Sequence, residues 1–279
     1  MKIGLLHPGA MGAALGACFR SCGHEVYWLN SERSAASQDR ARRAQLLAST
    51  HLDHLLSQAE LIVSICPPHA ADTVLDTIAT SGYEGHYLEA NAIAPKRLLL
   101  MRDRLAGSPI QLTDGSVIGL PLWPDETKGG TTLHLSGPHA ATLETLLAGS
   151  PLTVKRVSDQ LGDASALKMT FAAFSKGSAA LTAEILNVAS QYGVSNALAE
   201  QLGASTTQNW QQSLRATSAK AWRFSGEMKE IAETFRAVGA EPGFHEAASK
   251  VYQKLEKFKD WTEVPELSVL IAALKNHQD

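Results

Sequence analysis

The chain has 279 residues, 44% of them hydrophobic, which is enough material for two domains that each bury a core. Its 25 Lys and Arg residues nearly balance its 28 Asp and Glu residues, and the net charge of -3 gives no electrostatic basis for binding nucleic acid or an anionic membrane. No apolar run reaches the length of a membrane span. Cys18, Cys22 and Cys66 are too few for a disulfide framework and suit a reducing compartment, so we expect a cytoplasmic protein.

The first half of the chain alternates short apolar runs with amphipathic segments such as 33–48 and 69–79. The apolar runs have the length of strands, and the amphipathic segments have the spacing of helices. The predicted strands are residues 2–6, 24–29, 60–66, 86–90, 109–113, 131–135 and 152–157. This alternation predicts a mostly parallel sheet with right-handed crossovers.

After about residue 160 the strand pattern stops and only helical segments follow. The predicted helices are residues 163–192, 195–215, 220–238, 244–258 and 265–276. We therefore predict an α/β Rossmann domain with a doubly wound sheet over residues 1–160. An all-α domain over residues 161–279 follows, beginning with a long interdomain helix and serving substrate binding and dimerisation.

The long predicted helix is unusually poor in charge. Between Ala164 and Gln191 its charged residues are Lys168, Lys176 and Glu184. We expect such a helix to be buried nearly all round, and packing against the same helix of a second chain would achieve this. The sequence therefore predicts a homodimer, and each charge on the helix needs a partner, a wet cavity or a function.

The first predicted strand runs directly into a glycine-containing turn and then a helix. The predicted cofactor-binding loop consists of His7, Pro8, Gly9, Ala10, Met11 and Gly12. A dinucleotide fingerprint would have Gly at the position of His7, so the GxGxxG pattern is incomplete. Gly9 still allows backbone to approach a pyrophosphate, and Gly12 still allows the helix to pack on the strand. The helix N-terminus supplies N–H groups and positive potential for phosphates.

The end of the second strand distinguishes NADP from NAD. Enzymes that use NAD place Asp or Glu there to hold the ribose 2′-hydroxyl, whereas this chain has Asn30. Ser31, Arg33 and Ser34 can donate hydrogen bonds to a 2′-phosphate, so the sequence favours NADP(H). The alternative is that Arg33 is a solvated residue beside Glu32.

Several motifs together resemble one family. They are GLLHPGAMG at 4–12, SICPP at 64–68, LEANAIAPKR at 88–97, DGSVIG at 114–119, GDASALKMTFAAFSKG at 162–177, WRFSGEMKEIAETF at 222–235 and GFHEAA at 243–248. In their order and spacing they resemble the β-hydroxyacid dehydrogenase superfamily, which includes 6-phosphogluconate dehydrogenase and the imine reductases. The likeness is greatest to a phosphogluconate-dehydrogenase-like branch that has its own helical C-terminal domain.

The resemblance implies roles for residues at matching positions. Cys66 and Pro67 correspond to the backbone that contacts the cofactor after the fourth strand, and Asn91 to a position near the nicotinamide. Lys168 corresponds to the catalytic lysine of the family. Hydride transfer to a carbonyl leaves an alkoxide, and a lysine close to that oxygen can protonate it. The alternative for Lys168 is a packed stem with its ammonium in solvent.

The chain also departs from the family pattern. Ile118, Gly119 and Leu120 stand where hydroxyacid enzymes carry Ser-Gly-Gly for the substrate carboxylate, and Ala172 replaces an Asn four residues after the lysine. The loss of two polar anchors argues against a small hydroxyacid substrate. The predicted substrate residues are Gly119, Trp123, Ser175, Trp222 and His245, and for His245 a packing role is an equal alternative.

The leading hypothesis is an NADP(H)-dependent oxidoreductase that acts on a carbonyl or alcohol, with Lys168 as proton donor or acceptor. The alternatives are an imine reductase and a non-catalytic NADP-binding sensor. We expect a small-molecule substrate and no metal, because His51 and His54 lack the further ligands that a metal site needs.

Overall fold

The computed structural model describes residues 1–126, 130–259, 261 and 263–275. The chain forms two compact units, Met1–Lys168 and Met169–Asp279. The division proposed from the sequence, between residues 160 and 161, falls just before the helix Asp163–Gln191, in which the first unit ends.

The first unit is built on one sheet. Within the described residues this sheet has eight strands in the order β3-β2-β1-β4-β5-β6-β7-β8. The strands are β1 Lys2–Leu5, β2 Glu25–Leu29, β3 Leu47–Ser49, β4 Leu61–Ser64, β5 His86–Glu89, β6 Gln111–Ile118, β7 Thr132–Ser136 and β8 Thr153–Ser158. Neighbouring strands are parallel except for β6 and β7, which are antiparallel. This confirms the predicted mostly parallel, Rossmann-like sheet.

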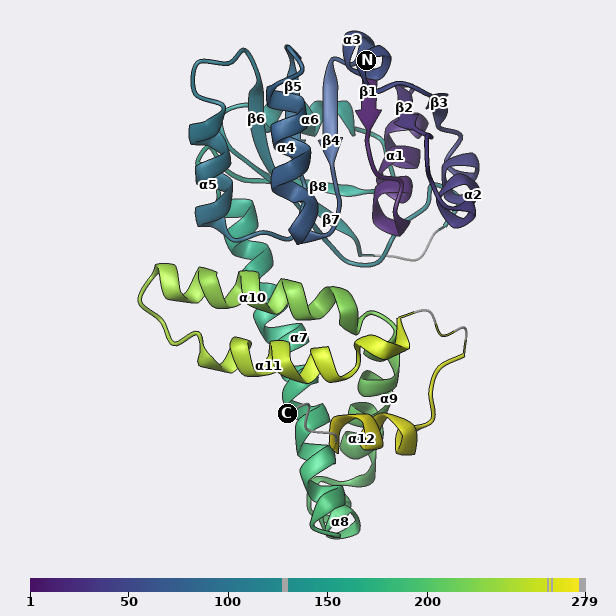
Figure 1. Cartoon of the computed structure of the whole chain (residues 1–279), viewed down its shortest axis with the longest axis vertical. Helices are drawn as coiled ribbons and strands as arrows, with labels where there is room; N and C mark the ends of the chain where they lie inside the picture. The colour runs from purple at the N-terminus through teal and green to yellow at the C-terminus, as the bar shows by residue number, and fades with distance from the viewer. Residues whose placement is uncertain (127–129, 260, 262, 276–279) are drawn as a thin grey trace. The chain divides into compact units, whose positions relative to one another are not determined.

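Helices cover both faces of the sheet, as Figure 1 shows. They are α1 Ala10–Ser21, α2 Ala35–Arg43, α3 Leu52–Gln58, α4 Ala71–Ala79, α5 Pro95–Arg104 and α6 Ala140–Leu146, with a 3-10 turn at Pro68–Ala70. Side chains of α1 and α6 pack on one face with Leu61 and Val63, while α3, α4 and α5 pack on the other with Ile62. Alternate residues of β4 thus enter opposite cores, as the two-residue period of a strand requires.

The second unit is helical. Its helices are α8 Ser195–Leu202, α9 Ala204–Ser218, α10 Ala221–Ala237, α11 Gly243–Lys254 and α12 Leu267–Lys275, with a 3-10 turn at Glu256–Phe258 and most of α7, Asp163–Gln191. Helices α10 and α11 lie side by side (Figure 1), where the rings of Phe224 and Tyr252 meet at 5.4 Å between centroids. The predicted all-α second part is confirmed.

Two of the predicted helices differ in the structure. Residues 47 and 48, predicted as the end of the helix 33–48, belong instead to β3, which pairs with β2 at the edge of the sheet. The predicted helix 195–215 is two helices, because Gly203 has a φ of +85°. In the single chain, apolar side chains of α7 are exposed, among them Phe174 at 75% and Leu181 at 59%.

No helix among the described residues is both long enough and apolar enough to cross a membrane.

Candidate nucleotide site

The glycine loop connects β1 to α1 at the carboxyl edge of the sheet. Gly12 lies so close to the loop that a Cβ on it would be 2.5 Å from the carbonyl oxygen of His7 and 2.9 Å from Cγ2 of Ile65. No side chain fits there, so Gly12 allows α1 to pack directly on the end of β1. A Cβ on Gly9 would instead meet nothing within 4 Å, which leaves open space beside the backbone of the loop.

The N-terminus of α1 has the polarity that an anion requires. Gly9 is its N-cap and, in the part of the chain that the structure describes, no side chain caps it. The first N–H groups of a helix have no partner within the helix, so those of Ala10 and Met11 can bind a phosphate. Pro8 is buried and completes the turn.

His7 occupies the position of the missing glycine. Burial, together with the charge of Arg33, lowers the pKa of His7 to about 4, so the ring is neutral at pH 7. Its Nδ1 atom is buried and has no hydrogen-bond partner among the described residues. An unused polar atom at this position fits a loop that is completed by a polar ligand.

The segment after β2 supplies two guanidinium groups to the same loop. Arg33 donates from Nη2 to the carbonyl oxygen of Leu6 at 3.2 Å and from Nε to that of Leu29 at 3.3 Å. Arg40 donates from Nε to the carbonyl oxygen of Pro8 at 3.0 Å and from Nη2 to Oγ of Ser37 at 3.1 Å. Arg40, which lies on α2, was not predicted from the sequence, although it is only seven residues after Arg33.

The remaining residues predicted after β2 differ in exposure. Asn30 is half-buried directly after β2, and its Oδ1 atom is buried without a hydrogen-bond partner in the described part of the chain. Ser31 and Ser34 are exposed, and Ser34 caps α2 by accepting a hydrogen bond from the backbone N–H of Ser37. The position that carries a carboxylate in NAD enzymes is thus polar and uncharged.

Asn91 ties the carboxyl ends of β4 and β5 together. Its side-chain oxygen accepts a hydrogen bond from the backbone N–H of Cys66, and its amide nitrogen donates to Oγ of Ser64 at 2.9 Å. Asn91 is 2% exposed, so its side chain holds the Cys66–Pro67 turn in place. Burial raises the pKa of the Cys66 thiol to about 12, which excludes a reactive thiolate near neutral pH.

A buried acid that the sequence analysis missed lies beneath Asn91. Glu89, the last residue of β5, accepts a hydrogen bond from the backbone N–H of Asn91 at 3.0 Å and is 1% exposed. Burial raises the pKa of Glu89 to about 8, and Asp114, its neighbour on β6, adds to that rise. Glu89 is therefore mostly protonated at pH 7.

Lys168 lies on the second turn of α7 and is half-buried. The other two charged residues between Ala164 and Gln191 have acidic or basic partners in the second unit. Lys176 forms an ion pair with the buried Glu227, and Nζ of Lys254 lies 4.0 Å from Oε1 of Glu184. Both are thereby accounted for as structural charges.

The predicted substrate residues are divided between the units. Gly119 has a φ of +132° at the end of β6, where a Cβ would be 2.5 Å from Oγ1 of Thr131. In the second unit, Ser175 is exposed on α7 and Nζ of Lys259 lies 4.5 Å from the ring centroid of Trp222. His245 is buried, 4.4 Å from the ring of Phe235, and its Nδ1 has no hydrogen-bond partner among the described residues.

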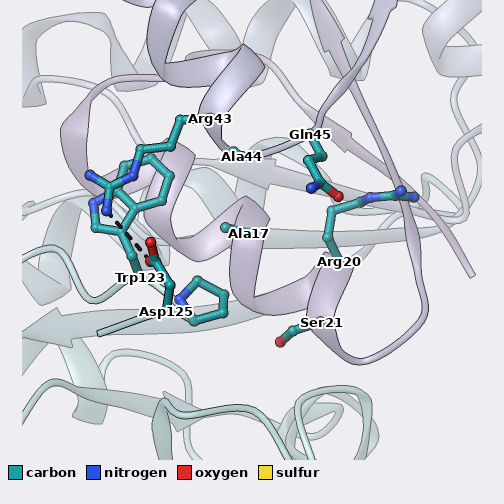
Figure 2. Close-up of a pocket in the computed structure, with 9 residues that line it drawn as sticks. Ala17, Arg20, Ser21, Arg43, Ala44, Gln45, Trp123 and Asp125 are labelled. Carbon is teal, nitrogen blue, oxygen red and sulfur yellow. Dashed lines mark hydrogen bonds and ion pairs between the residues drawn. The ribbon is translucent and has the colours of Figure 1, made fainter. Parts of the chain in front are cut away.

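Trp123 lines a cavity of about 300 Å³ beside the last turns of α1 and α2. Figure 2 shows the guanidinium of Arg43 stacked over the indole, 3.9 Å from its centroid, with Asp125 beside it. The indole is 7% exposed and packs on alanines of α1 and on Ala44. The contacts of Trp123 are thus with α1 and α2.

No group of three or more His, Cys, Asp and Glu side chains that could hold a metal ion occurs in residues 1–126, 130–259, 261 and 263–275. His51 and His54 are both exposed.

The two units match different family models. Residues 2–88 match the model described as NADP oxidoreductase coenzyme F420-dependent. Residues 189–255 match the model described as Domain of unknown function (DUF1932). No curated protein matches the sequence. The first match supports a nicotinamide cofactor for the sheet-containing unit.

Solved structures share the fold over nearly the whole chain. The 3-hydroxyisobutyrate dehydrogenase of Salmonella typhimurium has a TM-score of 0.68 at 15% identity, covering 98% of this chain and 99% of that one. A conserved protein of unknown function, described as structurally similar to 3-hydroxyacid dehydrogenases, has a TM-score of 0.65 at 23% identity, covering 93% and 98%. The imine reductase of Myxococcus stipitatus in complex with NADP+ has a TM-score of 0.55 at 16% identity, covering 99% and 100%.

The fold is thus a Rossmann-like nucleotide-binding unit followed by a helical unit. The two family models and these structures confirm the resemblance to hydroxyacid dehydrogenases and imine reductases at the level of the fold, in which a unit like that of NADP oxidoreductases precedes a separate helical unit.

Proposed function

We propose that the protein is an NADP(H)-dependent oxidoreductase that transfers hydride between the nicotinamide and a carbonyl or alcohol substrate. The glycine loop carries this proposal. Its open side at Gly9, the contact of Gly12 with His7 and the uncapped start of α1 form a cradle that fits a pyrophosphate. The unused Nδ1 of His7 lies in the same loop.

Arg33 and Arg40 support NADP(H) rather than NAD(H). Each guanidinium has five N–H donors, and the hydrogen bonds described above engage two of them, so each can also donate to a 2′-phosphate. Asn30 brings no negative charge to the end of β2, where a carboxylate would repel the phosphate.

Fluorescence titration with NADPH and NADH tests the cofactor. We expect NADPH to bind at least ~10-fold more tightly, a difference of ~1.4 kcal/mol. Arg33→Ala and Arg40→Ala should each weaken NADPH binding and leave NADH binding nearly unchanged. Arg42→Ala is the matched control, because Arg42 lies on α2 with Arg40, but its side chain is 76% exposed and pairs with Asp39. Equal affinities of the wild type for the two cofactors would overturn the NADP assignment.

Lys168 is the proposed proton donor in reduction and acceptor in oxidation. Nicotinamide, when bound, supplies or accepts the hydride. The ammonium of Lys168 would stabilise the charge that develops on the substrate oxygen and then protonate it. Lys168 lies on the turn of α7 that still belongs to the sheet-containing unit, which supports a role at the cofactor.

Substitution of Lys168 by Met tests this role, since Met keeps the volume of the stem and removes the ammonium. NADPH oxidation at 340 nm, screened with carbonyl and imine compounds, identifies a substrate. With that substrate, Lys168→Met should lower kcat by ~100-fold or more while NADPH affinity and Tm change little. Near-normal turnover of the variant would overturn the assignment. A wild type that binds NADPH but reduces none of the compounds would favour the sensor alternative.

Reduction of C=N is the second candidate function. Ile118 and the buried Ala172 stand where hydroxyacid enzymes carry polar anchors for a carboxylate, which favours a less polar substrate. Turnover of cyclic imines but not of carbonyl compounds in the same screen would select this alternative.

We also propose that the protein is a homodimer assembled through α7. Apolar side chains of α7 are exposed in the single chain, and Leu181, Ile185 and Val188 line a groove of about 340 Å³ that continues to Val194 and Leu198. Exposed apolar surface of this kind is typical of protein interfaces, and the same helix of a second copy has the complementary character.

A further inference from the structure

Asp114 is a fully buried acid of β6 that the proposed function does not use. Its Oδ2 atom accepts hydrogen bonds from Oγ of Ser136 at 2.8 Å, from the backbone N–H of Gly162 at 3.1 Å and from that of Ser165 at 2.9 Å. Its Oδ1 atom accepts a hydrogen bond from Oγ of Ser165 at 2.7 Å. Both oxygens are therefore engaged, and every partner donates.

These hydrogen bonds cap the N-terminus of α7 from the sheet. The first N–H groups of a helix lack partners within it and are usually satisfied by a side chain just before the helix. In α7 the acceptors for these N–H groups come from strands of the sheet. Oγ of Ser136 on β7 accepts a hydrogen bond from the backbone N–H of Ala164 at 2.9 Å, and Asp114 on β6 accepts from the backbone N–H groups of Gly162 and Ser165. An acidic group at this end also complements the helix dipole.

The capped turn directly precedes Lys168. Ala164 and Ser165 lie four and three residues before Lys168, and residues at this spacing lie on one face of a helix. Asp114 is in register with Glu89, the last residue of β5, so the cap lies level with the carboxyl edge of the parallel strands. The start of α1 is at the same edge.

We propose that Asp114, with Ser136, is a positioning residue for Lys168: it holds the first turn of α7 on strands β6 and β7 and thereby sets where the lysine stands at the carboxyl edge. This inference rests on the proposed catalytic role of Lys168. Asp114 acts through the helix and does not touch the reacting atoms.

The test compares Asp114→Ala, Asp114→Asn and Asp163→Ala in the full chain. Asparagine can place its side-chain oxygen where Oδ2 of Asp114 accepts three hydrogen bonds, so Asp114→Asn is the conservative variant that should retain the cap lost in Asp114→Ala. Asp163 is the matched control, because it lies in the same first turn of α7 but is exposed and accepts from Ser158 at 2.6 Å. Lysines are reductively methylated with ¹³C, the Lys168 resonance is identified by Lys168→Arg, and spectra are recorded with and without NADPH.

In Asp114→Ala the Lys168 resonance should shift to the position of exposed lysines, and amides of residues 165–168 should exchange ~10-fold faster or more. Asp114→Asn should restore most of the wild-type Lys168 resonance position and of the slow amide exchange. Asp163→Ala should change neither the resonance nor the exchange rates. The resonance of Lys176, farther along α7 and paired with Glu227, should stay in place.

An unmoved Lys168 resonance in Asp114→Ala, an equal shift of Lys176, or an equal effect of Asp163→Ala would overturn the positioning role. If Asp114→Ala does not fold, Ser136→Ala removes the acceptor of the Ala164 N–H with the carboxyl intact and should give the same pattern. The spectra without NADPH do not depend on cofactor binding. Failure of the wild type to bind NADPH would therefore contradict the proposed function, whereas the positioning role of Asp114 would still be decided by the spectra recorded without NADPH.

Discussion

Replacement of Glu89 by Gln should stabilise the protein at alkaline pH. The carboxyl of Glu89 is fully buried, and burial raises its pKa from an ordinary value of 4.5 to about 8. Glutamine resembles the protonated acid in shape and polarity. Its oxygen can still accept the hydrogen bond from the backbone N–H of Asn91.

The sign of the effect follows from proton linkage. Between pH 4.5 and about 8 the unfolded chain has lost the proton of Glu89 while the folded chain keeps it, so unfolding releases a proton. The free energy of unfolding of the wild type therefore falls as the pH rises through this window and levels off above it. The difference between the two pKa values corresponds to on the order of 5 kcal/mol, at ~1.4 kcal/mol for each pH unit.

Thermal unfolding of both proteins from pH 5 to pH 8.5 measures this difference. Glu89→Gln and the wild type should have similar Tm values near pH 5, and at pH 8.5 the variant should be higher by roughly 10 °C, at 2–4 °C for each kcal/mol. Glu84→Gln is the control, because Glu84 is exposed just before β5. A Tm difference between Glu89→Gln and wild type that does not grow with pH would refute the reasoning.

Two further predictions concern the glycine loop and the dimer. Gly12→Ala should abolish measurable NADPH binding, because the added methyl would lie 2.5 Å from the carbonyl oxygen of His7. Gly9→Ala should keep the fold, because a methyl there would meet nothing within 4 Å. Isothermal titration measures NADPH binding and circular dichroism measures the fold, and tight NADPH binding by Gly12→Ala would contradict the role of the loop. The wild type should scatter light as about twice the chain mass of 29.8 kDa, and Leu181→Asp, which places a charge in the α7 groove, should shift it toward one chain mass. An active wild type of one chain mass would exclude the dimer.

The sequence pattern predicted the sheet well wherever strands are apolar. It placed β1, β2, β4 and β5 within one or two residues of their observed ends, because continuous apolar runs are typical of buried parallel strands. It ended β6 at residue 113, whereas the strand continues to Ile118. Asp114, Gly115 and Ser116 interrupt the apolar run, and Asp114 is buried because its hydrogen bonds come from β7 and α7.

Residues of the candidate site could be predicted from the sequence where they belong to a short motif of consecutive residues. Gly9, Gly12 and Arg33 follow from the turn after β1 and the end of β2. Arg40 and Glu89 do not, because the partner of each lies on a neighbouring element and only the folded chain brings them together.

The hydrogen bonds of Arg33 and Arg40 to loop carbonyls have a consequence for the thermodynamics of binding. Immobilising a long, flexible side chain on ligand binding costs about 0.5–1.5 kcal/mol. Both guanidinium groups are already held on the carbonyls of Leu6 and Pro8 before any nucleotide arrives. The site is preorganised, so most of that entropic cost is met during folding. If the two arginines bind the 2′-phosphate as proposed, NADPH binding should therefore proceed with little loss of entropy from their side chains.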